Sequence, residues 1–96
     1  MEQQIVNEIK ELFARKSFTL QTIQLYWNDL QEMEFERQPD WAWIYQKVYL
    51  HACLKGHRDV ADWLREIFEQ TADPIQKIAY RQTYAYGNHL LQKHKA

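Results

Sequence analysis

Apolar residues recur every three or four positions along most of this chain, which is the spacing of an amphipathic α-helix. Stripes of this kind cover residues 2–15, 19–36, 41–55 and 58–70, and a last one starts at residue 74 and runs toward the C-terminus. The pattern predicts an all-α fold of five or six helices.

Residues with strong positional preferences mark the ends of these predicted helices. Ser17 or Thr19 can cap the second helix, and Asp40 and Asp73 are placed to cap the third and the last. Gly56 follows the third helix, where glycine commonly adopts the left-handed conformation that ends a helix.

The third predicted helix is apolar on two opposite faces. One face carries Trp41, Tyr45, Val48 and Ala52, and the other carries Trp43, Leu50 and Leu54. Because a helix that is apolar on both sides packs between neighbours, we expect it at the centre of the fold. Gly87 either divides the last helix in two or lies inside one long helix, at a cost of about 1 kcal/mol.

Short connections favour contact between helices that follow each other in sequence. We therefore expect successive antiparallel hairpins within a single domain of residues 1–96. The hairpins form either a compact bundle or a stacked, repeat-like array.

One segment has the pattern of a known repeat. Residues 52–57 read Ala-Cys-Leu-Lys-Gly-His and are followed by Val60, Ala61 and Leu64. This resembles the helix-turn-helix core of an ankyrin repeat over residues 48–70, with a fainter copy at residues 79–91. The segment Val-Tyr-Leu-His at 48–51 stands where the family has Thr-Pro-Leu-His. The resemblance implies an ankyrin-like stacked scaffold that binds proteins; the alternative is a glycine turn between two helices of an ordinary bundle.

The composition narrows the expected location of the protein. Cys53 is the one cysteine, so the chain has no internal disulfide, which fits a reducing compartment. The first ten residues lack the features of a secretory signal, and no stretch has the roughly 18 consecutive apolar residues of a membrane span. We expect a cytoplasmic protein that does not enter a membrane.

Charge is distributed unevenly along the chain. Residues 1–39 carry seven acids and four bases, and residues 40–73 carry six acids and four bases. Residues 74–96 carry four bases and no acid, on a chain whose net charge is −1. The balance argues against a general nucleic-acid binder and sets a basic element on an acidic body.

The last helix holds the main candidate contact patch. Drawn as one helix, it has Ile75, Ile78 and Tyr86 on the side expected to face the core, and the opposite side carries Lys77, Tyr80, Arg81 and Tyr84. Tyrosine and arginine are common in the residues that dominate binding energies. Alternatively, these bases complement a helix C-terminus or contact the acids of the second helix.

Leu25 and Trp43 are secondary candidates for partner binding. Leu25 falls on the polar side of the second helix, and Trp43 lies on the second apolar face of the third. If they are uncovered, they mark a self-association surface. A homodimer could then join the acidic end of the second helix in one copy to the basic last helix of the other.

Metal and catalytic sites have little support in the sequence. His51 and Cys53 are two positions apart on one helix, so their side chains diverge, and the five-residue spacing of His89 and His94 misses helical zinc spacing. Cys53 beside His51 or His57 could form a thiolate–imidazole pair, but a core cysteine is the simpler interpretation. We expect no metal, no cofactor and no enzymatic activity.

A DNA-binding helix-turn-helix is also disfavoured. The helix that would enter the groove carries four acids, which phosphates repel: Asp59, Asp62, Glu66 and Glu69. The sequence therefore favours a helical protein–protein interaction module, such as a small adaptor or an inhibitor or regulator of a larger complex. The alternative is a nucleic-acid-associated regulator that uses the basic, tyrosine-rich last helix.

Overall fold

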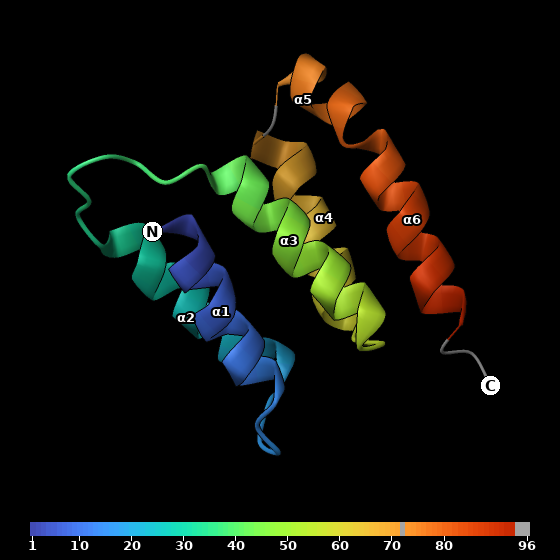
Figure 1. The fold of residues 1–96 in the computed structure, drawn as a ribbon, viewed down its shortest axis with the longest axis horizontal. Coiled ribbons are helices and arrows are strands. Elements are labelled where there is room, and N and C mark those ends of the chain that lie inside the picture. The colour runs from blue at the N-terminus through green and yellow to red at the C-terminus, as the bar shows by residue number, and fades with distance from the viewer. Residues whose placement is uncertain (72, 94–96) are drawn as a thin grey trace.

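The structure, a computed structural model, describes residues 1–71 and 73–93, which form α-helices and no strands (Figure 1). The six helices of these residues are α1 (Glu2–Phe13), α2 (Leu20–Glu32), α3 (Trp41–Leu54), α4 (Arg58–Thr71), α5 (Pro74–Ala79) and α6 (Arg81–Gln92). This confirms the predicted all-α class. None of these helices is both long enough and apolar enough to cross a lipid bilayer.

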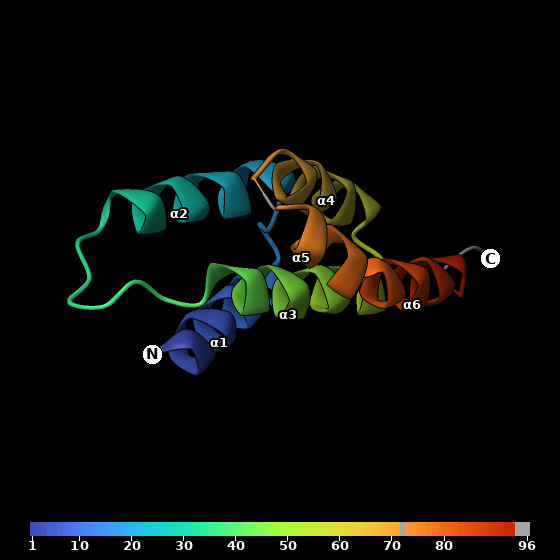
Figure 2. The same ribbon diagram turned by 90° about the horizontal axis from the view of Figure 1, so that it is seen from above.

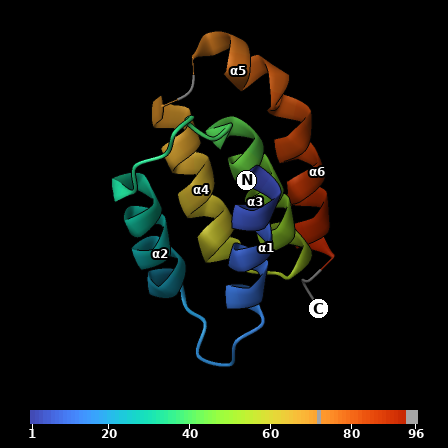
Figure 3. The ribbon, with the colours of Figure 1, turned by 60° about the vertical axis from the view of Figure 1, so that its left-hand side comes forward.

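The helices pack in two layers. Figure 2 shows α1, α3 and α6 side by side in one layer, with α2 and α4 in the other and α5 between them at one end. The most extensive contacts join α3 to α4, α6 and α1, and α2 contacts both α1 and α4. The prediction that the doubly apolar third helix is central is confirmed. Antiparallel hairpins form between α1 and α2 and between α3 and α4 (Figure 3), whereas α5 and α6 meet end to end at Tyr80.

Side-chain caps begin the helices at the predicted residues. Thr19 and Asp73 each form a capping box with the residue three positions later, and the Asp40 carboxylate accepts a hydrogen bond from the Trp43 backbone N–H (3.2 Å). Gly56 has φ 77°, and the N–H of the next residue, His57, donates to the Ala52 carbonyl oxygen (2.9 Å). This bonding pattern ends α3 and turns the chain into α4.

The second helix ends earlier than predicted. It stops at Glu32, and Met33 is already extended with φ −71° and ψ 144°. The segment that follows returns to the bundle, with Phe35 edge-on to Trp41 (centroids 6.0 Å apart). The Glu2 carboxylate accepts the Asp40 backbone N–H (2.9 Å), which holds the pKa of Glu2 below its ordinary value. These contacts fix the start of α3 against the start of α1.

The last helix is interrupted at Tyr80 rather than at Gly87. Tyr80 has φ −96° and ψ 6° between α5 and α6, whereas Gly87 lies inside α6. The hairpin of α3 and α4 therefore has its glycine turn, but the fainter second copy at residues 79–91 has a continuous helix at the corresponding glycine. The resemblance to ankyrin repeats stays a prediction.

An aromatic cluster joins the two layers. The Trp27 side chain is 3% exposed and lies between α2, α3 and α4. Its ring centroid is 4.7 Å from that of Tyr45, 5.6 Å from Trp41 and 6.4 Å from Trp63. Three rings from two other helices thus pack on one side chain of α2, which makes Trp27 the main apolar link between α2 and the rest of the core.

Candidate functional site

A surface groove runs between α4 and the α5–α6 pair, and we call it the α4–α6 groove. Three of the four residues of the predicted main patch line it: Lys77, Arg81 and Tyr84. Its remaining lining residues are Arg65, Glu69, Ala85 and Asn88. The fourth predicted residue, Tyr80, lines the cavity next to this groove. The structure thus brings the predicted patch together and adds α4 as its second wall.

The local sequence sets the angle between α5 and α6. Asp73 caps α5 by accepting the Gln76 backbone N–H (2.8 Å), and Pro74 at the first helical position has the φ that a helix needs. At the joint, the Tyr80 N–H donates to the Gln76 carbonyl oxygen (3.0 Å), and the Tyr80 carbonyl oxygen accepts from the Tyr84 N–H (3.1 Å). Hydrogen bonds on both sides of the joint hold the bend that places α5 beside the end of α4.

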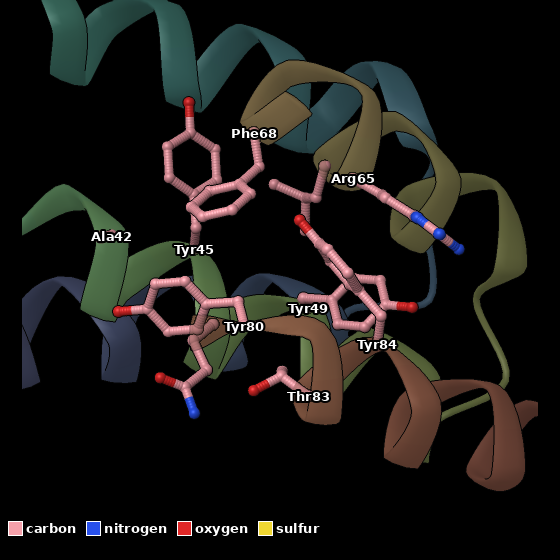
Figure 4. A pocket seen from close by; sticks show the side chains of 10 residues that line it. Ala42, Tyr45, Tyr49, Arg65, Phe68, Tyr80, Thr83 and Tyr84 are labelled. Carbon is pink, nitrogen blue, oxygen red and sulfur yellow. The ribbon is translucent and has the colours of Figure 1, made fainter. Parts of the chain in front are cut away.

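Aromatic rings form the inner wall beneath the groove (Figure 4). Phe68 lies edge-to-face with Tyr80 (centroids 5.1 Å apart), Tyr84 (6.0 Å) and Tyr45 (6.1 Å). Tyr84 is also edge-to-face with Tyr49 (5.3 Å). These rings leave a cavity of about 10 Å³, close to the room that one water molecule occupies. The wall is therefore well packed and gives the groove a rigid base.

The predicted orientation of the last helix is wrong in both of its parts. Ile75, Ile78 and Tyr86 were expected to face the core, but they are 78%, 68% and 54% exposed. Tyr80 and Tyr84 face inward instead and are half-buried. The prediction assumed a single continuous helix. The joint at Tyr80 instead lets the two tyrosine rings pack on Phe68 and Tyr49. This arrangement is favoured because a tyrosine ring buries more area than an isoleucine side chain.

Arg65 connects the aromatic wall to the charged rim. Its guanidinium carbon lies 4.7 Å from the Tyr84 ring centroid, and its Nε pairs with Glu69 Oε1 (3.3 Å). The Tyr84 hydroxyl is buried and has no hydrogen-bond partner within residues 1–71 and 73–93. Burial and the Glu69 carboxylate raise the pKa of Tyr84 to about 12, against the opposing effect of Arg65. Tyr84 is therefore a neutral phenol at physiological pH.

The charge of the groove is positive. Arg65, Lys77 and Arg81 line it together with one acid, Glu69, which is already paired with Arg65. Arg65 was missed in the sequence because the polar side of α4 is mostly acidic, and the Arg65 side chain was not assigned to any surface. The sequence did show that Arg65 lies four residues before Glu69, a spacing that predicts an ion pair on one helix. That spacing does not indicate which other helix faces Arg65. Lys95, a base of the predicted basic segment, lies outside the described residues.

The two secondary candidates lie apart from this groove. Leu25 is 58% exposed on α2, and Trp43 is half-buried on α3, so they belong to different layers. Lys47 Nζ lies 5.5 Å from the Trp43 ring centroid and covers part of that ring. The structure does not join Leu25 and Trp43 into one surface.

The side chains considered for catalysis are packed into the core or against aromatic rings. The Cys53 thiol is buried, and burial raises its pKa, so it is not a thiolate at neutral pH. His51 and His57 lie against the Phe13 ring, with centroids 5.0 and 5.2 Å away. Within residues 1–71 and 73–93, no three His, Cys, Asp or Glu side chains gather closely enough to hold a metal ion. His94, whose spacing from His89 argued against a zinc site, lies outside this part of the chain.

Comparison with models of protein families, with curated proteins and with solved structures gave no match to this chain.

Proposed function

We propose that the chain is a non-enzymatic protein-binding module, of the adaptor or regulator kind, and that the α4–α6 groove holds an acidic segment of its partner. The observation that carries this proposal is the meeting of Arg65, Lys77 and Arg81 around one groove with a rigid aromatic base. The body of the protein is otherwise acidic, so the groove is a local positive site. We also propose that it acts in the cytoplasm, as the single cysteine suggests.

Each part of the groove would contribute in its own way. Guanidinium groups at Arg65 and Arg81 can bond a carboxylate through two parallel N–H groups. Lys77 adds charge on a flexible stem at the α5 end of the groove. The packed rings behind Tyr84 keep the guanidinium of Arg65 in place, so little side-chain entropy is lost when an acidic segment binds.

The alternative of single-stranded nucleic acid has weaker support. Bases bind such surfaces by stacking on exposed aromatic faces. Here Tyr80 and Tyr84 pack edge-to-face on Phe68, and Arg65 lies over the Tyr84 ring. Part of each tyrosine ring is thus occupied by Phe68 or Arg65, which favours an acidic polypeptide as the ligand.

An affinity pull-down from native extract tests the proposal. The groove variant Arg65→Gln/Lys77→Gln/Arg81→Gln removes three bases, and we expect it to lose a protein that the wild type retains. The control variant Lys10→Gln/Arg15→Gln/Lys16→Gln removes three exposed bases on and just after α1 and should retain it. Circular dichroism establishes that all three proteins are folded.

Two results would count against the proposal. Loss of the bound material after nuclease treatment would make nucleic acid the ligand, as would affinity for a labelled oligonucleotide that falls steeply with salt. Equal loss in the groove and control variants would mean that binding follows overall charge and not this groove. A labelled oligo-glutamate peptide, titrated with each variant, gives the same comparison without an extract.

A further inference from the structure

A second groove lies between α1 and α2 on the opposite side of the α3 N-terminus from α5. Its walls are apolar and come from Ile5, Leu30, Met33 and Phe35, and Glu8 and Asp29 stand at its rim. The Met33 side chain is 54% exposed. Glu8 accepts a hydrogen bond from the Tyr26 hydroxyl at this edge. We call this feature the α1–α2 groove.

The charge around the α1–α2 groove is negative. Asp29 and Glu32 lie on the last turn of α2, and Glu34 follows in the exposed segment after it. Carboxylates at a helix C-terminus are disfavoured by the helix dipole, and none of the last-turn residues of α2 is basic. An apolar groove with this rim suits a basic surface that carries branched aliphatic side chains, and methionine adapts its shape to such side chains.

The outer face of α5 has the complementary composition. Ile75 and Ile78 are the most exposed large apolar residues of the described chain. Lys77 lies between them in sequence, Arg81 begins α6, and both bases are exposed. Covering these two isoleucines with a second surface is favourable, because it removes their apolar area from water. Among the helices described, α5 is the one with no buried residue, so it contributes little to its own core.

Both surfaces lie at the same end of the bundle. α1 and α3 begin at this end, α2 and α4 finish there, and α5 follows directly (Figures 1 and 3). The start of α3 stands between the two surfaces. On one side the Asp40 backbone N–H donates to the Glu2 carboxylate. On the other side, burial and the negative charge of Asp40 raise the pKa of Tyr80. An α5 helix therefore cannot reach the α1–α2 groove of its own chain without leaving α6, but a second copy can present one.

We propose that this end of the bundle is a self-association surface, in which the Ile75–Ile78 face of α5 in one copy enters the α1–α2 groove of a second copy. A twofold axis near the start of α3 lets each copy give one α5 and receive one, so the contact closes as a dimer. Lys77 and Arg81 then face Asp29 and Glu32 of the other copy. This inference goes beyond the proposed function. Its apolar contact is made by Ile75 and Ile78, which do not line the α4–α6 groove, whereas Lys77 and Arg81 line that groove as well.

The mass of the full chain in solution tests the pairing. In sedimentation equilibrium, we expect the apparent mass of the wild type to rise with protein concentration from 11.8 kDa toward twice that value. Ile78→Glu places an acid opposite the acidic groove and should raise the dimer dissociation constant by about tenfold or more. Ile78 is 68% exposed, so this change leaves the fold intact, which circular dichroism checks.

Matched variants locate the contact. Leu25→Glu makes the same chemical change at another exposed position and should dimerise like the wild type, as should Arg65→Gln, which affects only the α4–α6 groove. Asp29→Lys/Glu32→Lys and Lys77→Glu/Arg81→Glu should each be monomeric alone, and should form a mixed dimer when combined. A wild type that stays monomeric at every concentration overturns the proposal. So does an Ile78→Glu variant that dimerises normally, or an equal loss in Leu25→Glu.

Discussion

Replacing Trp27 with alanine is expected to lower the free energy of unfolding by about 3–5 kcal/mol. The side chain is 3% exposed, and its ring contacts those of Tyr45, Trp41 and Trp63. Truncation removes its buried area and leaves a cavity between α2, α3 and α4 that three rings cannot fill without moving. For a domain of this size, whose whole stability is about 5–15 kcal/mol, the loss is a large fraction. Urea denaturation followed by circular dichroism measures it.

Trp43→Ala is the matched control for this experiment. It deletes the same side chain from α3, but Trp43 is half-buried on the outer face, with Lys47 over its ring. We expect it to cost clearly less than Trp27→Ala. Equal losses in the two variants would mean that the cluster around Trp27 is not the main link between the layers.

Replacing Gly87 with alanine should also destabilise the protein, by about 1–2 kcal/mol, although alanine is the better helix former by about 1 kcal/mol. A Cβ at this position would lie 2.5 Å from Tyr49 Cε1 and 2.9 Å from Cys53 Sγ. Tyr49 is buried and in contact with Tyr84, so its ring has little room to withdraw. The close approach of α6 to α3 therefore depends on glycine.

Thermal unfolding of Gly87→Ala and Asn88→Ala separates packing from helix propensity. Asn88 is the next residue of α6 and is exposed, so alanine there should leave the melting temperature unchanged or raise it slightly. A Gly87→Ala variant as stable as the wild type would show that α6 can shift away from α3 without cost. Gly87→Val extends the series and should lower the melting temperature further.

The caps and apolar stripes made much of the fold predictable. Asp40, Gly56 and Asp73 determine local hydrogen bonds with their own neighbours in sequence, so their roles could be read from the chain. The end of α2 could not, because the apolar and acidic pattern continues past Glu32 while the helix stops where Phe35 packs on Trp41. That contact joins separate segments and leaves no local signal.

The candidate groove was predictable only in part. Lys77, Arg81 and Tyr84 were identified from one helix, but their second wall comes from α4 through Arg65. The inward turn of Tyr80 and Tyr84 depends on the joint between α5 and α6, where Tyr80 takes a conformation that no proline or glycine signals. Gly87, the residue that seemed able to break the helix, is instead needed for packing.

The packing of α6 over Cys53 makes the reactivity of this thiol a measure of how often α6 separates from α3. Cys53 is the one thiol of the chain. α6 covers its sulfur so closely that a Cβ added at Gly87 would lie 2.9 Å from it. A thiol reagent can therefore modify the native protein only when α6 separates from α3 or the whole chain unfolds. The rate of alkylation, compared with the rate of global unfolding, measures how often the last helix detaches, with no added label.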